Sequence, residues 1–186
     1  MIQKFIALIL IIILSPVLLL ISIISIMSDG FPIIYYQKSY GLNEIEFNLY
    51  KFRTMKVGTP KISTENFDQT SSQKYVLGFG NFLRKFSLDE LPQLFNVLFG
   101  HILFIGARPG MTENEEKLHE LRKLKGIYNL KPGITGWAQV NGRDKNSAEM
   151  KVDLDLYYVR NKNFLLNFKI IKKTILVVLL RKDIKH

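Results

Sequence analysis

The sequence predicts a mixed, helix-rich α/β protein with a membrane-embedded N-terminal segment followed by one small folded lobe. Three observations support this prediction. Residues 5–27 form an uncharged apolar run, residues 33–55 contain an alternation of apolar and polar side chains, and later segments repeat apolar residues at helical spacing. Apolar residues make up 47% and charged residues 23% of the 186-residue chain, which is ordinary for a folded protein and excludes the disordered and fibrous classes.

The apolar run is long enough to enter a membrane, because about 20 apolar residues suffice to cross a bilayer. A cleaved signal peptide is disfavoured, since the run exceeds a usual signal core and no A-x-A site follows. Two geometries stay open: a spanning helix, or a re-entrant helix that breaks at Ser15-Pro16 and leaves by the same face. Pro16 lacks an N–H and clashes with the preceding turn, so we expect a kink there. The Ser15 hydroxyl can bond a carbonyl in that turn.

The chain is basic and contains no cysteine. Its 26 Lys and Arg residues against 16 Asp and Glu give a net charge of +10, which requires an anionic partner such as nucleic acid, acidic lipid or a phosphorylated small molecule. Nucleic acid is disfavoured, because the cations are spread along the chain and a membrane anchor fits such a partner poorly. The absence of cysteine excludes disulfides, a cysteine nucleophile and zinc–thiolate sites.

The rest of the pattern alternates short strands, loops and helices. Residues 33–55 read as two strand-like pieces around a turn, and residues 57–73 as a polar surface loop. Thr112 and Glu115 have the spacing of a capping box. The tail, residues 164–186, fits either a helix lying on an anionic membrane or a core helix with exposed lysines. Helices are expected over residues 77–86, 87–99, 112–125 and 148–159.

Residues 87–94, S-L-D-E-L-P-Q-L, permit two interpretations. Ser87 and Glu90 have capping-box spacing, which would make the segment an ordinary helix start. Pro92 falls too deep for the favoured first position of such a helix. The alternative is a functional pair of carboxylates, Asp89 and Glu90, near a helix N-terminus. An ionised Asp can attack phosphorus or hold Mg²⁺.

Candidate phosphate-binding cations stand in three other motifs. Lys51 and Arg53, in K-F-R-T-M, are expected on one face of a strand, where they either grip phosphates or form a solvated face. Arg108, followed by Pro109, stands in the turn of residues 106–110, and its guanidinium suits bidentate phosphate contact.

The third motif, residues 131–143, reads K-P-G-I-T-G-W-A-Q-V-N-G-R. Its three glycines permit close backbone approach to a ligand, and Arg143 offers a fork for phosphate. Trp137 either stacks on a ligand or packs. The three histidines, residues 101, 119 and 186, lack the spacing of metal ligands.

The ordered set K-F-R-T-M, S-L-D-E-L-P-Q-L, A-R-P-G and K-P-G-I-T-G-W-A-Q-V-N-G-R follows an apolar segment with Ser-Pro. This set resembles the monotopic phosphoglycosyl transferases, also called the bacterial sugar transferase family, in their minimal single-domain form. The resemblance covers nearly the whole chain, and four motifs in order are far more specific than any one of them.

The resemblance implies transfer of a sugar 1-phosphate from a UDP-sugar, expected to be an N-acetylated hexosamine, to polyprenyl phosphate, usually undecaprenyl phosphate. It implies a Mg²⁺ cofactor, release of UMP and a covalent phosphosugar intermediate. By this resemblance Asp89 is expected to be the nucleophile and to hold the metal. Glu90 is expected to deprotonate or orient the incoming lipid phosphate. Arg108 and Pro109 match the nucleotide-side motif. Weaker candidates for phosphate contacts are Arg143, Lys51 and Arg53.

The resemblance also implies an organisation. Residues 1–30 are expected to form a re-entrant helix–break–helix with the break at Ser15 and Pro16. Residues 31–186 are expected to form a catalytic domain on the cytoplasmic face of the bacterial inner membrane, with both termini cytoplasmic, interfacial amphipathic helices and anionic lipid as a partner. The oligomeric state stays open, as do the sugar and the pathway.

Two positions depart from the family pattern. This chain has Ala107 where relatives usually have proline, and Ser39 where they commonly have arginine. The competing function class is a membrane-anchored basic scaffold or binding protein, which would not need the Asp89-Glu90 pair.

Overall fold

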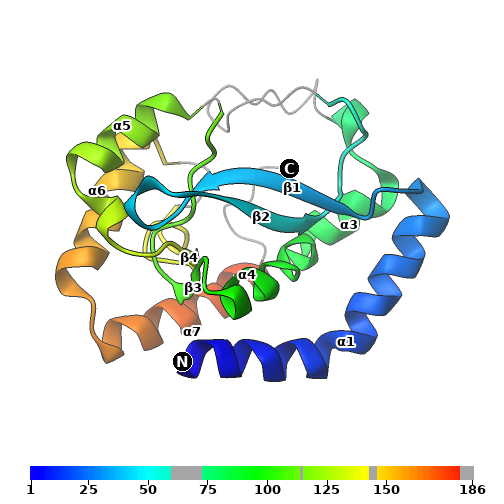
Figure 1. Ribbon diagram of the computed structural model, residues 1–186, viewed down its shortest axis with the longest axis horizontal. Helices are drawn as coiled ribbons and strands as arrows, with labels where there is room; N and C mark the ends of the chain where they lie inside the picture. The colour runs from blue at the N-terminus through cyan, green and yellow to red at the C-terminus, as the bar shows by residue number, and fades with distance from the viewer. Residues whose placement is uncertain (60–72, 114, 143–145, 181–186) are drawn as a thin grey trace.

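A computed structural model describes residues 1–59, 73–113, 115–142 and 146–180. The expected loop over residues 57–73 therefore lies largely outside the described residues. A long bent helix lies along one side of a lobe that contains two small sheets and several shorter helices (Figure 1). In chain order the elements are α1 (Ile2–Asp29), β1 (Ile34–Tyr40), η1 (Leu42–Glu44), β2 (Glu46–Phe52), η2 (Gln73–Tyr75), α3 (Gly78–Lys85), η3 (Leu88–Glu90), α4 (Gln93–Phe99), β3 (Leu103–Ile105), α5 (Glu116–Leu124), η4 (Ile127–Asn129), β4 (Gly133–Thr135), α6 (Ala148–Asn161) and α7 (Phe164–Leu180).

Helix α1 is long and apolar enough to cross a membrane, and only 11% of its most apolar stretch is buried inside the protein. Figure 1 shows that the helix bends sharply between its two halves. Pro16 lies inside the helix, and the Ser15 hydroxyl donates a 2.8 Å hydrogen bond to the Ile12 carbonyl oxygen. These contacts confirm the expected bond to the preceding turn, and a proline is the ordinary cause of a sharp bend.

Both halves of α1 contact the same lobe. In the first half Ala7 is fully buried against β2 and α4, and the side-chain oxygen of Gln3 accepts a hydrogen bond from the Phe104 amide. In the second half Ile21 packs against Phe52 and Leu83. A straight helix of this length would extend about 42 Å. The bend therefore returns the second half to the lobe that the first half already contacts.

Strands β1 and β2 form the antiparallel hairpin that the alternating pattern predicted. Their register pairs Ile34 with Phe52 and Tyr40 with Glu46. Leu49 and Phe52 are almost fully buried in two separate clusters, and both clusters include a residue of α1. Side chains alternate along a strand, so Lys51 shares the face of Leu49, and Phe52 points to the other face.

A second pairing, which the sequence did not reveal, joins the motif around Arg108 to the glycine-rich motif. Strands β3 and β4 run parallel, with Leu103 opposite Gly133 and Ile105 opposite Thr135. A Cβ on Gly133 would lie 2.1 Å from the backbone nitrogen of Gly106. A Cβ on Gly136 would lie 1.9 Å from the backbone oxygen of Gly106. Only glycine permits these approaches, so two of the three glycines serve backbone packing.

Helices α5 and α6 pack against each other through Leu118, Ala148 and Val152. Helix α6 begins as expected, and the Ser147 hydroxyl caps it by accepting a bond from the Met150 amide. The expected capping box of Thr112 and Glu115 is wrong. Helix α5 begins at Glu116, because the Glu115 carboxylate accepts a 2.8 Å bond from the Met111 amide instead.

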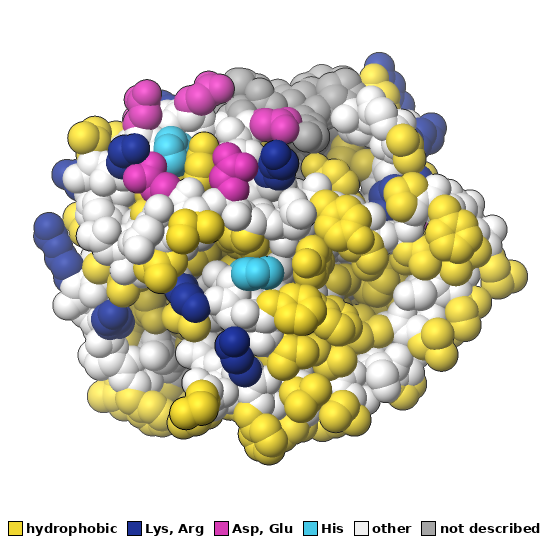
Figure 2. Space-filling view, in the orientation of Figure 1, with side chains coloured by type: hydrophobic (Ala, Val, Ile, Leu, Met, Phe, Trp, Pro, Cys, Tyr) yellow, Lys and Arg dark blue, Asp and Glu magenta, His cyan; other side chains and the backbone are white. Residues whose placement is uncertain are grey.

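One face of helix α7 packs in the core, and contact of its other face with a membrane stays a prediction. Ile170 is fully buried with Val140 and Tyr158, so one face belongs to the core. The outward face is apolar and exposed at Phe164, Leu165, Phe168, Ile171, Ile175 and Leu176. Figure 2 shows hydrophobic side chains gathered over α1 and the lower edge of the molecule, whereas acidic side chains gather at the upper left, in the region of α5. Residues 181–186 lie outside the described part.

Candidate active site

The Asp89-Glu90 pair lies on η3, between α3 and α4. The expectation of one helix over residues 87–99, capped by Ser87, is wrong. Ser87 has a positive φ of 54° and makes no capping bond, and α4 begins only after Pro92. A left-handed residue cannot start a helix in the usual way, so the chain turns sharply here and presents both carboxylates on a single short turn.

Glu90 is fixed by two cations from distant parts of the chain. Both terminal nitrogens of Arg108 contact the two carboxylate oxygens, one of them at 3.3 Å. The Lys51 amine lies 3.9 Å from one of the same oxygens. A two-pronged Arg–carboxylate contact fixes orientation as well as distance. The structure thus brings together three of the residues that the sequence singled out.

Asp89 is a largely buried acid whose pKa is shifted. Its pKa is raised from 3.8 to about 6, first because burial disfavours the charged form, and second because the Glu90 carboxylate repels it. Lys51, Arg84 and Arg108 act in the opposite direction. A carboxyl that is strongly desolvated yet surrounded by cations is typical of functional sites.

Lys51 reaches the site from β2. Burial and the nearby Arg108 charge lower the pKa of its amine, whereas Glu90 and Asp89 raise it. Arg84 approaches from the last turn of α3 and contributes to the potential at Asp89. Sequence reasoning missed Arg84, which the pattern marked only as a basic residue at a helix end.

The other predicted site residues have different positions. The Arg53 guanidinium donates bonds of 2.6 and 2.7 Å to the carbonyl oxygens of Asp29 and Gly30, so it closes the C-terminal end of α1 rather than joining the carboxylates. Pro109 is buried directly after Arg108. Arg143 lies outside the described residues.

Trp137 packs instead of presenting an open ring face. Tyr157 stacks on it with ring centroids 5.6 Å apart, and the Lys169 and Lys173 amines lie 5.4 and 4.8 Å from its centroid. These contacts join the glycine-rich motif to α6 and α7. They favour packing over ligand stacking, the two interpretations that the sequence left open.

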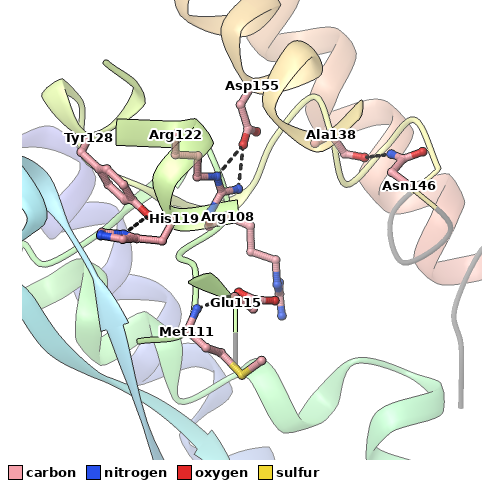
Figure 3. A network of polar contacts seen from close by, with 9 residues as sticks. All are labelled: Arg108, Met111, Glu115, His119, Arg122, Tyr128, Ala138, Asn146 and Asp155. Carbon is pink, nitrogen blue, oxygen red and sulfur yellow. Dashed lines mark hydrogen bonds and ion pairs between the residues drawn. The ribbon is translucent and has the colours of Figure 1, made fainter. Parts of the chain in front are cut away.

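The backbone of residues 107–111, which carries Arg108, is held at several atoms (Figure 3). The Ala107 carbonyl accepts a bond from the Gly133 amide, and the Gly110 carbonyl from the Tyr40 amide. The Arg108 carbonyl accepts a 2.8 Å bond from the Arg122 guanidinium. Arg122 in turn contacts Asp155 at 2.7 and 3.1 Å.

Sequence reasoning missed Arg122 and Asp155, although a signal was present. Arg122 follows Leu118 by one helical turn, and Asp155 follows Val152 by three residues. Each charge therefore lies on the apolar side of its helix, and a charged residue on such a face usually has a buried partner.

A comparison with known protein families shows to which family the chain belongs. The model of the bacterial sugar transferase family matches residues 1–181. The chain belongs to this family.

Several curated relatives of this bacterial sugar transferase cover most of its chain. The uncharacterised sugar transferase EpsL of Bacillus subtilis is 39% identical over 84% of this chain and 75% of its own length. The UDP-glucose:undecaprenyl-phosphate glucose-1-phosphate transferases of Xanthomonas campestris and Escherichia coli are 37% and 36% identical over 97% and 91% of this chain. The chain spans only 38% and 37% of those two proteins.

The donor set of the transferase agrees with magnesium, which binds through one or two carboxylates together with substrate phosphates. Asp89 supplies a carboxylate whose desolvation a cation would relieve. No group of three or more His, Cys, Asp or Glu side chains that could hold a metal by itself occurs among the described residues. Magnesium therefore stays a prediction, with Asp89 as the residue that would hold it.

Proposed function

We propose that this transferase moves a sugar 1-phosphate from a UDP-sugar to undecaprenyl phosphate and releases UMP. The observation that carries the proposal is Asp89, a desolvated carboxyl surrounded by Lys51, Arg84 and Arg108. This combination supplies a nucleophile and a cationic surface for a diphosphate at one place. Relatives named as undecaprenyl-phosphate glucose-1-phosphate transferases support the same reaction class.

In the proposed first step an oxygen of ionised Asp89 attacks the sugar-linked phosphorus. The phosphoanhydride bond breaks, and UMP leaves with the bonding electron pair. The product is a phosphosugar attached to the Asp89 carboxylate. With a pKa of about 6, this carboxyl is mostly ionised at neutral pH and yet poorly solvated, which favours attack.

In the second step an oxygen of the lipid phosphate attacks the same phosphorus. The bond to Asp89 breaks, the carboxylate is regenerated, and a sugar–diphospholipid is released. Glu90 is proposed to orient the incoming phosphate or accept its proton, in a position fixed by Arg108 and Lys51. Magnesium held at Asp89 would neutralise the diphosphate and stabilise the leaving UMP.

The sugar is a separate question. The resemblance predicts an N-acetylated hexosamine, whereas curated relatives with a sugar in their names mention glucose or galactose. We propose testing both classes side by side. The packing of Trp137 and the position of Arg53 disfavour a ligand-stacking role for the first and a phosphate contact for the second.

We also propose that α1 is re-entrant and places the lobe on the cytoplasmic face of the inner membrane. Support comes from the bend near Pro16 and from the contacts of both helix halves with one lobe. A lipid phosphate lies at headgroup depth, so the acceptor would meet Asp89 only if the lobe rests on the interface. The exposed apolar face of α7 and its lysines suit an anionic surface.

The test of function is UMP release from the full chain in detergent with Mg²⁺, undecaprenyl phosphate and a panel of UDP-sugars. The panel contains UDP-glucose, UDP-galactose and the N-acetylated hexosamine donors. We expect release with one donor and a loss of at least about 10³-fold in Asp89→Asn, because the amide is not a nucleophile here. Wild-type turnover in this variant would overturn the covalent mechanism.

A labelled donor separates the two steps. With sugar-labelled donor and no lipid acceptor, the full chain should retain label after denaturation, and Asp89→Asn should retain none. The competing scaffold function predicts neither UMP release nor retained label in either protein.

A cysteine placed at residue 2 tests the topology. If α1 is re-entrant, this cysteine stays unlabelled by an impermeant reagent added outside intact cells. Pro16→Ala straightens the helix and exposes the cysteine to the reagent. Labelling of the otherwise unchanged chain would contradict re-entry and favour a spanning helix.

A further inference from the structure

The reacting carboxylates are connected to the buried ion pair Arg122–Asp155 through one backbone carbonyl. Arg122 is 3% exposed and Asp155 is 1% exposed. The hydrogen bonds of Arg122 go to Asp155 and to the Arg108 carbonyl, so the pair acts on the carboxylates through Arg108, and neither residue is assigned a catalytic role. Their effect on the carboxylates passes through the backbone that carries Arg108 (Figure 3).

Arg122 divides its hydrogen bonds between two partners. One terminal nitrogen donates to the Arg108 carbonyl oxygen at 2.8 Å. The other terminal nitrogen and the Nε donate to a single Asp155 oxygen at 2.7 and 3.1 Å. A lysine in this place has one ammonium on a flexible stem and cannot reproduce the planar fork.

The surroundings of Arg122 favour this division. A Cβ on Gly110 would lie 3.2 Å from the terminal nitrogen that bonds the Arg108 carbonyl, so glycine leaves room for the guanidinium. Burial raises the pKa of the nearby Tyr128 hydroxyl to about 12, which keeps it neutral, and it lies 3.1 Å from His119. The Arg122 guanidinium is thus held in one position between α5, α6 and the loop of residues 107–111.

We propose that the Arg122–Asp155 pair is a positioning device that fixes the backbone of Arg108 and thereby aims its guanidinium at Glu90, next to Asp89. Asp155 orients Arg122, Arg122 holds the carbonyl of residue 108, and Arg108 holds both oxygens of Glu90. The chain of contacts links α6 to the reacting carboxylates. This inference rests on the proposed function only for its kinetic readout.

A second ion pair on the same two helices provides a matched control. Lys117 on α5 contacts Glu149 on α6, but these side chains are 65% and 52% exposed. Lys117→Met/Glu149→Leu removes a link between α5 and α6 while leaving the Arg108 carbonyl bonded. It should change neither the loop nor the kinetics.

The kinetic test is a double-mutant cycle between Arg122→Lys and Arg108→Ala. In the otherwise unchanged chain, Arg122→Lys should lower kcat for UMP release about fivefold or more. In the Arg108→Ala background the same change should alter kcat by less than about twofold, because the side chain that it positions is already gone. Equal losses in both backgrounds would overturn the proposal, since a merely structural role lowers activity regardless of Arg108.

A second variant covers the case in which Arg122→Lys does not fold. Arg122→Met/Asp155→Leu replaces the buried pair with apolar side chains of similar size, a change that often preserves stability. It should show the same dependence on Arg108. A folded double variant with wild-type kcat would overturn the proposal.

Hydrogen exchange provides a readout that needs no turnover. Peptides covering residues 106–112 should exchange faster in Arg122→Lys and in Arg122→Met/Asp155→Leu than in the wild type or the Lys117/Glu149 control. Unchanged exchange in these peptides would overturn the proposal even if the wild type is active. If the wild type releases no UMP, faster exchange still supports the positioning role while the proposed function fails.

Discussion

Two clusters of charge meet at Arg108, one at its backbone carbonyl and one at its guanidinium, and they differ in what their charges achieve. Arg122 and Asp155 are buried and bond directly to each other. Asp89 and Glu90 are partly exposed, and Asp89 retains a raised pKa despite three nearby cations. Burial raises the pKa of Asp155 as well, but Asp155 bonds directly to Arg122 and fixes the geometry of that side chain. Asp89 lies on a partly exposed turn among several cations, where a substrate can reach it.

Removing one partner of the buried pair should have the largest effect on stability. We expect Asp155→Ala to lower the free energy of unfolding by about 3–5 kcal/mol, because it leaves the Arg122 charge buried and unpaired. Denaturant unfolding in a fixed detergent measures the change. Glu149→Ala, which breaks the exposed pair with Lys117, serves as control and should change little. Equal effects of the two substitutions would contradict the distinction drawn here.

Removing a cation from the reactive cluster should instead affect turnover. We expect Arg108→Ala to lower kcat/KM for UMP release by about 10²-fold, since it frees Glu90 and removes positive charge beside Asp89. Arg108→Lys should recover only a small part of the kcat/KM lost in Arg108→Ala, because an ammonium cannot make the two-pronged contact with Glu90. An unchanged kcat/KM in Arg108→Ala would exclude a role for this side chain.

The raised pKa of Asp89 also has a consequence for stability. The ionised form of Asp89 is disfavoured in the folded state, so this group lowers the free energy of unfolding above about pH 6. The loss disappears as the pH falls towards 3.8. Asp89→Asn should therefore stabilise the substrate-free protein by about 1–3 kcal/mol at pH 8. The gain should vanish near pH 4. Thermal unfolding at both pH values measures it, and a loss of stability at pH 8 would contradict the assignment.

The smallest predicted effect concerns the pH dependence of turnover. Because the pKa of Asp89 lies at about 6, kcat/KM should fall about tenfold per pH unit below that value as the carboxyl becomes protonated. Above pH 7 it should level off. Initial rates of UMP release between pH 5 and 8 provide the measurement. A flat profile down to pH 5 would mean that Asp89 titrates like an ordinary carboxyl.

Local signals in the sequence predicted much of the fold. Alternation over residues 33–55 predicted the hairpin, and helical spacing with Ser147 ahead of it predicted α6. The two capping boxes failed for one reason. Each carboxylate has another partner: Glu90 contacts Arg108 and Lys51 from distant parts of the chain, and Glu115 accepts a bond from the Met111 amide four residues before it. Spacing alone does not reveal such partners.

The candidate site shows the same division. The motif sequences singled out Asp89, Glu90, Lys51 and Arg108, and the structure brings these four together. Arg53 was chosen on the same grounds, yet it bonds the end of α1, because its position just after β2 places it beside Asp29 and Gly30. Arg122 and Asp155 escaped notice because each looks like an ordinary charge until its helix is packed.

The sequence by itself determined the long apolar segment, the order of the motifs and the family, since these depend on residue types and their spacing along the chain. Only the tertiary structure decided which cations surround Asp89, how α1 folds back onto the lobe, and which arginine fixes the loop of Arg108. Each of these outcomes joins residues far apart in the chain, and burial sets their charges and their pKa values. The spacing of residues along the sequence reveals neither these long-range contacts nor the burial.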